Sequence, residues 1–86
     1  MSNQVEQKSI EVLKNDFPEH QEIIDVIAEN TELFMELATD YYICKRNIHF
    51  TEVDNKKSIT EEYKYTLERL KEEIELFLNG KKVIQK

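Results

Sequence analysis

The sequence predicts an all-α protein. Glycine and proline, the residues that most often interrupt helices, occur once each among the 86 residues, as Gly80 and Pro18. Apolar residues recur in alternating steps of four and three along two long segments, which is helical spacing. A short polar connection, Asp-Asn-Lys-Lys at residues 54–57, separates the two segments. Because so short a connection joins antiparallel neighbours, the two helices are expected to form a hairpin.

A short helix is predicted ahead of the hairpin, over residues 3–15. The residue before a proline avoids the α region, so Phe17 should separate this helix from the next one. Pro18 suits the first turn of a helix, where its missing N–H is not needed. Asp16 is placed to cap that helix, and Glu19, three residues on, completes a box-like arrangement.

The first arm of the hairpin is predicted to be one helix over residues 18–50. Its apolar seam keeps the alternating spacing for more than three heptads. The seam contains one polar residue and reads Ile23, Ile27, Asn30, Phe34, Leu37, Tyr41, Cys44 and Ile48. Residues 47–53 also alternate between apolar and polar types, so the end of this arm is open between fraying helix and extended chain.

The second arm is predicted over residues 58–79. Ser58 and Glu61 have the spacing of a capping box at its start. Its seam reads Tyr63, Leu67, Leu70, Ile74 and Phe77. Gly80 is a suitable helix stop because glycine adopts positive φ without strain, and residues 80–86 are expected to form a loose tail.

Residues 1–86 are long enough for a single domain only. A two-helix hairpin of this size buries little apolar surface, and its only cysteine, Cys44, cannot form an intramolecular disulfide. The hairpin is therefore expected to be completed into a bundle by the N-terminal helix, by self-association, or by both. A homo-oligomer is predicted, with a dimer favoured. Whether the N-terminal helix covers its own hairpin or that of a second copy stays open.

The charge pattern excludes several classes of partner. Charged residues make up 35% of the chain, and the net charge is −6. Residues 1–55 carry twelve acidic and four basic side chains, whereas residues 56–86 carry six and eight. An acidic chain is poorly suited to nucleic acid or to an anionic membrane surface. No apolar run is long enough to span a bilayer, and no signal peptide is recognisable, so a cytoplasmic location is expected.

Two stretches of the sequence resemble the YdcH-like family of short bacterial proteins of unknown function. The first is Phe17-Pro18-Glu19 followed by Ile23, Ile24, Asn30, Phe34, Leu37 and Tyr41, and the second is Leu67, Arg69 to Ile74, and Leu78. The resemblance covers roughly residues 12–79. It implies a self-associating helical hairpin in the bacterial cytoplasm, with no enzymatic activity and no catalytic residues. Two departures are the fifteen or so residues before Phe17 and the Glu72-Glu73 pair where the family tends to have Asp-Glu.

Five residues are candidates for a functional role. A polar residue in an apolar seam commonly fixes helix register or partner, which is the preferred role for Asn30 over a binding contact. The other four are apolar or aromatic residues outside the seam. They form a candidate interaction surface, because exposed aromatic side chains are enriched at protein interfaces: Leu33, Tyr42, Phe50 and Tyr65.

Neither catalysis nor metal binding has support in the sequence. Cys44 and His49 are not one helical turn apart, and no second pair of ligands follows them, so a structural metal site is not expected. A thin hairpin offers no cleft that excludes water, so an enzyme and a bound cofactor are not expected either. The preferred function is a protein–protein interaction or assembly module. The alternative is a small-ligand, metal-binding or enzymatic protein with a pocket at the helix interface.

Overall fold

The computed structural model describes residues 4–80 and is all-helical, as the sequence predicted. A single 3₁₀ turn and four helices follow one another, and no strand occurs among these residues. In chain order the elements are α1 (Gln4–Asp16), η1 (Pro18–His20), α2 (Gln21–Asn30), α3 (Glu32–Val53) and α4 (Lys57–Leu78).

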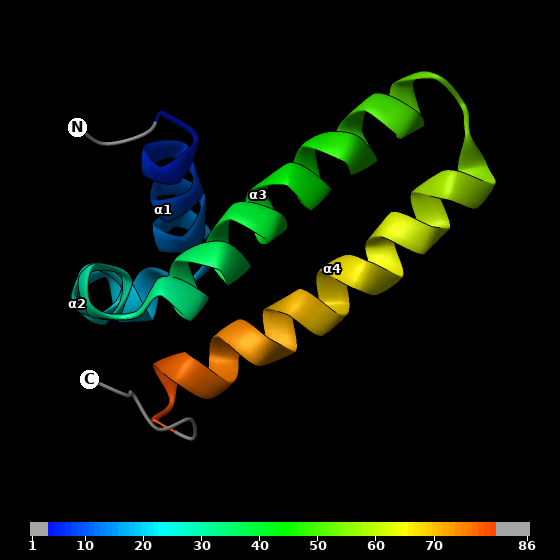
Figure 1. Cartoon of the computed structure of the whole chain (residues 1–86). Helices are drawn as coiled ribbons and strands as arrows, with labels where there is room; N and C mark the ends of the chain where they lie inside the picture. Colours follow the sequence, from blue (N-terminus) through cyan, green and yellow to red (C-terminus); the bar gives the residue numbers. More distant parts are fainter. Residues whose placement is uncertain (1–3, 81–86) are drawn as a thin grey trace.

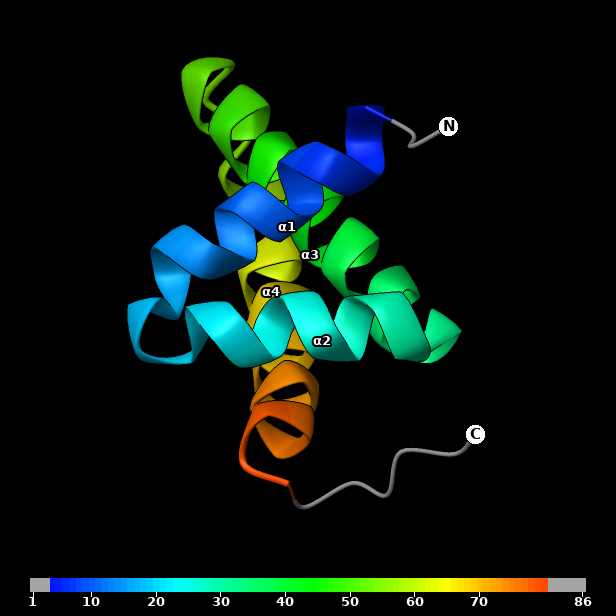
Figure 2. The same ribbon diagram turned by 90° about the vertical axis from the view of Figure 1, so that its left-hand side faces the viewer.

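The two longest helices, α3 and α4, run antiparallel and side by side, joined by a turn at residues 54–56 (Figure 1). Helices α1 and α2 pack across one end of this pair (Figure 2). We call this end, which comprises α1, α2, residues 32–46 and residues 67–78, the base. We call residues 47–66, the part nearest the turn, the arm. The molecule measures 42 × 29 × 22 Å, and the arm accounts for much of its length.

The single helix expected over residues 18–50 is wrong, because the chain breaks at Thr31. Thr31 has extended backbone angles, with φ −140° and ψ 106°, and separates α2 from α3. Asn30 and Thr31 both have side chains that compete with helical hydrogen bonding, and the Asn30 amide donates to the Val26 carbonyl at 2.7 Å. The break allows α2 to fold back over the base, where one straight helix would have carried its apolar side chains away from the core.

The register of α2 also differs from the expected seam. Ile24 and Ile27 are buried, while Ile23, a predicted seam residue, is 40% exposed. In α3 the expected seam is retained at Phe34, Tyr41 and Cys44, which are buried. The remaining seam residues of α3 are half-buried: Leu37 and Ile48.

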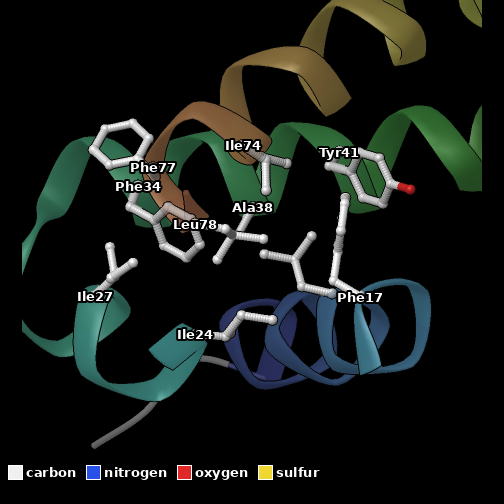
Figure 3. Close-up of a cluster of buried hydrophobic side chains, with 10 residues drawn as sticks. Phe17, Ile24, Ile27, Phe34, Ala38, Tyr41, Ile74, Phe77 and Leu78 are labelled. Atoms are coloured by element: carbon white, nitrogen blue, oxygen red, sulfur yellow. The ribbon is translucent and has the colours of Figure 1, made fainter. Parts of the chain in front are cut away.

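The hydrophobic core lies entirely in the base. Figure 3 shows Ile24 and Ile27 of α2 directed toward Leu78 of α4 and Phe34 of α3. The rings of Phe34 and Phe77 meet edge to face with centroids 5.4 Å apart, a favourable arrangement for two aromatic rings. From α1, Leu13 is fully buried in the same cluster. The N-terminal helix therefore covers its own hairpin, which was left open by the sequence.

The predicted seam of α4 is buried at one end only. Ile74 and Phe77 are buried in the base, whereas Tyr63, Leu67 and Leu70 are half-buried. The gradient has a simple cause. Only the base has a third and a fourth helix to cover the α3/α4 pair, and the arm has two helices alone.

Neither predicted capping box forms. Asp16 is the last residue of α1, and its carboxylate is taken up by side chains of α3 instead of capping the next helix. Helix α4 begins one residue before Ser58, with Lys56 at its N-cap position and no side-chain capping bond. Thr60, within the expected box, turns inward and donates its hydroxyl to the Thr51 hydroxyl at 2.6 Å.

The two hairpin helices, α3 and α4, each end at a defined position. Residues 47–53 are helical and complete α3, which settles the alternative that the sequence left open. Helix α4 stops at Leu78, and Gly80 takes a φ of +72°, the left-handed conformation expected of a glycine stop. The loose tail predicted over residues 80–86 lies, apart from Gly80, outside the described residues.

Candidate interaction surface

The carboxylate of Asp16 joins α1 to α3. Its Oδ2 accepts a hydrogen bond from the Tyr41 hydroxyl at 2.6 Å and another from Lys45 Nζ at 2.7 Å. Burial alone would raise the pKa of Asp16, but these two hydrogen bonds and the Lys45 charge outweigh it and hold the pKa below its usual value. Burial, followed by the nearby Asp16 charge, raises the pKa of Tyr41.

These groups join one helix to another. Tyr41 and Lys45, which bind the Asp16 carboxylate, belong to α3, so this group lies at the junction of α1 and α3. Burial likewise raises the pKa of the Cys44 thiol, whose Sγ donates to the Tyr63 carbonyl at 3.1 Å. A thiol with a raised pKa is a poor nucleophile at neutral pH because little thiolate is present. Among residues 4–80, no three histidine, cysteine, aspartate or glutamate side chains are arranged so that they could hold a metal ion.

The four side chains of the predicted interaction surface do not form one patch. Leu33 is 51% exposed, Phe50 is 52% exposed and Tyr65 is 67% exposed, while Tyr42 is half-buried. Leu33 and Tyr42 are nine positions apart on α3, which at roughly 100° per residue puts them on opposite sides of the helix. Tyr65 lies nine positions before buried Ile74, so it faces outward from α4.

Tyr42 and Phe50 are linked through a residue that the sequence reasoning did not single out. The Arg46 guanidinium lies 5.7 Å from the ring centroid of Tyr42 and 5.7 Å from that of Phe50. The three side chains follow one another at four-residue spacing, so they stack along one side of α3. The sequence signal for Arg46 was this i, i+4, i+8 pattern of aromatic, cation and aromatic.

The structure places Asn30 at the exposed C-terminal end of α2. Its side chain is exposed, and its amide donates a hydrogen bond to the backbone of its own helix. The prediction that Asn30 lies in a helix–helix seam is therefore wrong within this chain. The cause is the break at Thr31, which removes the continuous seam on which the prediction depended.

A second residue missed by the sequence reasoning is Ile43, which is 43% exposed. It lies on the side of α3 that faces away from the core, where residues recur at steps of four and three. This side, which we call the open face of α3, contains Glu36, Asp40, Ile43, Asn47 and Phe50. The same spacing that marks the seam thus marks a second stripe, but one with mixed polarity, which made it hard to recognise.

Two surface hollows of the molecule are lined largely by charged side chains. One, of about 260 Å³, lies at the turn, beside the bonded Thr51 and Thr60 hydroxyls and several lysines. Another, of about 360 Å³, lies beside Met35 and is lined by four carboxylates: Glu6, Glu32, Glu36 and Asp40. The carboxylates mark the first half of α3 as strongly acidic.

Comparisons with known proteins find no matching family model, curated protein or solved structure. The resemblance to the YdcH-like family therefore stays a prediction. Within residues 4–80, none of the helices is both long enough and apolar enough to cross a membrane.

Proposed function

We propose that this protein is a non-enzymatic interaction or assembly module that self-associates, with a dimer favoured, and that it belongs with the YdcH-like helical hairpins of the bacterial cytoplasm. One observation carries the proposal. In the arm, the apolar side chains of both helices stay partly or fully exposed, because no third helix covers them. They are Ile48, Phe50, Val53, Ile59 and Tyr63.

The composition of the arm supports the same conclusion. Its only buried residue is a polar one, Thr60, which is 5% exposed and satisfied by the Thr51 hydroxyl. Two helices without a covering layer expose one side of each apolar seam, and apolar surface that is left open in this way commonly marks a contact with another molecule. The base, in contrast, has a closed core of its own.

The groups whose pKa is shifted favour a binding role over a catalytic one, because they take part in helix packing. Asp16, Tyr41 and Cys44 each serve the packing of one helix on another. The alternative function, a ligand or enzymatic pocket at the helix interface, has no specific observation in its favour, since the α3/α4 interface in the base is occupied by core side chains.

Sedimentation velocity over a concentration series tests the proposal. The wild-type chain is expected to shift from monomer toward dimer as its concentration rises. A triple variant with Phe50, Val53 and Ile59 changed to serine should stay monomeric, because it loses exposed apolar contact area in the arm. Val26→Ser is the matched control, since Val26 is an exposed apolar residue of α2 that lies outside this surface.

Circular dichroism of each variant shows whether the helices remain folded. A wild-type chain that sediments as a monomer at every concentration would disprove self-association. A pull-down from the source cytoplasm, with the wild-type chain and the triple variant as baits, then asks whether another protein uses the same surface. Proteins bound equally by both baits would not depend on it.

A further inference from the structure

We propose that two copies of this chain pair antiparallel along the open face of α3, about a two-fold axis at Ile43, with Arg46 of each copy against Asp40 and Glu36 of the other. This inference rests on the proposed self-association and adds the face, the orientation and the residues. Three observations carry it: the exposure of the stripe, its charge pattern and its symmetry.

The open face, with Arg46 at its edge, has apolar residues at its centre and toward one end. Ile43 lies at the midpoint of α3, Phe50 lies two turns further along the same face, and both are exposed. Figure 1 shows that α4 lies along one side of α3 only, which leaves the opposite side of its second half without a covering helix. A second α3 laid along this side would cover apolar side chains at the centre and near both ends of the contact.

The charges of the open face form no ion pairs among the described residues of one copy. Glu32, Glu36 and Asp40 follow one another at four-residue spacing, where like charges repel. None of these carboxylates has an ion pair among the described residues. Arg46 has only uncharged or weakly basic neighbours three and four positions away, namely Tyr42, Ile43, His49 and Phe50. Its guanidinium rests on aromatic rings and has no carboxylate partner in the described chain.

An antiparallel second copy resolves this arrangement. A two-fold axis at Ile43 pairs positions that are equally far from it. A residue three positions before Ile43 on one helix, for example, faces the residue three positions after Ile43 on the partner helix. Asp40 then faces Arg46, and Glu36, one turn further out, faces Phe50, on whose ring Arg46 rests. The contact is isologous and closes as a dimer, since each copy contributes the same residues.

The alternatives fit less well. A parallel pair would place the acidic half of one α3 on the acidic half of the other, which costs free energy. The outer side of α4 also exposes Tyr65 and Leu76, but there Arg69 shares its surface with Glu72 and Glu73, so the side lacks two separated charge blocks. A basic peptide could satisfy the acidic half alone, but it would leave Arg46 and Phe50 uncovered.

A charge-swap experiment tests the orientation. Arg46→Glu makes the open face more acidic, and Glu36→Lys/Asp40→Lys places basic side chains where two acidic ones stood. Each variant alone should dimerise at least about tenfold more weakly than wild type, because like charges then meet at positions 40 and 46 across the axis. An equimolar mixture of the two should form a heterodimer, since positions 40 and 46 again carry opposite charges across the axis. Variants that had merely lost their fold would not recover on mixing.

The matched controls are Arg69→Glu and Glu62→Lys/Glu72→Lys, which reverse the same types of charge on exposed positions of α4. They should leave the dissociation constant of the homodimer unchanged. If the controls weaken the dimer as much as the open-face variants do, net charge rather than this contact governs association, and the inference is wrong.

The axis is tested separately by cysteine crosslinking in a Cys44→Ala background. Ile43→Cys should form a disulfide-linked dimer with copper–phenanthroline, because a residue on a two-fold axis meets its own copy. Ile23→Cys, at a similarly exposed isoleucine of α2, should not. Suppose that the wild type dimerises, but the charge-swap variants do not pair on mixing and Ile43→Cys does not crosslink. That result would overturn the α3 pairing and leave self-association standing. A wild-type monomer at all concentrations would overturn both.

Discussion

Asp16 decides how the first helix docks on the rest of the molecule. Leu13 supplies the apolar contact of α1, but an apolar contact alone does not fix the angle at which two helices cross. The carboxylate receives hydrogen bonds from Tyr41 and Lys45, one turn apart on α3, so it specifies a single position of the end of α1. Lys14 adds an ion pair with Asp25 at 2.6 Å, which ties α1 to α2. Both side chains of this ion pair are more exposed than that of Asp16, although Lys45 is also partly exposed, so the pair contributes less to stability than the Asp16 group does.

Asp16→Asn is expected to lower the free energy of unfolding by about 1 to 3 kcal/mol at pH 7, the range for hydrogen bonds to a charged group. The pKa of Asp16 is lower in the folded than in the unfolded chain, so its stabilising effect is complete above the unfolded value of about 3.9. It disappears as the pH falls through the lower folded value. The difference between wild type and variant should therefore shrink below pH 4.

Urea denaturation at pH 7, 4, 3 and 2 measures this difference. Glu29→Gln, at an exposed position of α2, controls for the loss of a carboxylate. A gap between wild type and Asp16→Asn that stayed the same down to pH 2 would show that the ionised form of Asp16 has no special role.

At the scale of elements, the break between α2 and α3 is the feature that shapes the base. A straight helix over both segments would project α2 beyond the end of α4 and leave Ile24 and Ile27 in water. Ending α2 at Asn30 turns it back, and its apolar side chains then close the core over Phe34 and Leu78. The break has a local cost. Thr31 stands at the N-cap position of α3 without a capping bond, and its hydroxyl is buried with no partner.

The register of α2 gives a direct test of the break. Ile24→Ala should lower the free energy of unfolding by about 2 to 5 kcal/mol, because Ile24 is fully buried and the substitution leaves a cavity. Ile23→Ala, one position away and partly exposed, should change it by only about 0.5 kcal/mol. Both values come from chemical denaturation. An equal loss of unfolding free energy for both variants, or a larger loss for Ile23→Ala, would instead support the continuous seam that the sequence predicted.

The whole molecule divides into a closed base and an open arm. The base contains the buried apolar cluster, four helical segments and the Asp16 group. The arm contains two helices whose apolar residues are only half covered and whose buried residue is Thr60. Helices with few buried apolar contacts open more readily than those in a core. A bound partner would therefore stabilise the arm against local opening.

Native-state hydrogen exchange should detect this division. At low protein concentration, backbone amides of residues 47–66 are expected to exchange at least about tenfold faster than those of residues 32–46 and 67–78, because opening the arm exposes little apolar surface. At high concentration, protection should rise in α3 before it rises in α4 if copies pair along α3. Uniform protection over both helices at low concentration would show that the arm is stable by itself.

The candidate surface was predictable only in part. Leu33, Phe50 and Tyr65 were predicted to be exposed and are exposed, since helical periodicity reports which residues avoid the core. Their grouping into one surface was not predictable, because the phase of a helix is known only relative to its neighbours. Ile43 and Arg46 were missed because they interleave with charged residues, and no apolar pattern marks them.

By itself, the sequence determined that this protein is all-helical, that a turn follows residue 53, and that α4 packs through Tyr63 to Phe77, since these properties depend on local spacing and composition. Only the tertiary structure decided that the first arm breaks at Thr31, that Ile24 replaces Ile23 in the core, and that Asp16 binds α3 instead of capping a helix. The reason is physical. The four-three spacing is satisfied equally by one long helix and by two short ones, and the choice depends on the free energy of closing a core formed by residues far apart in the chain.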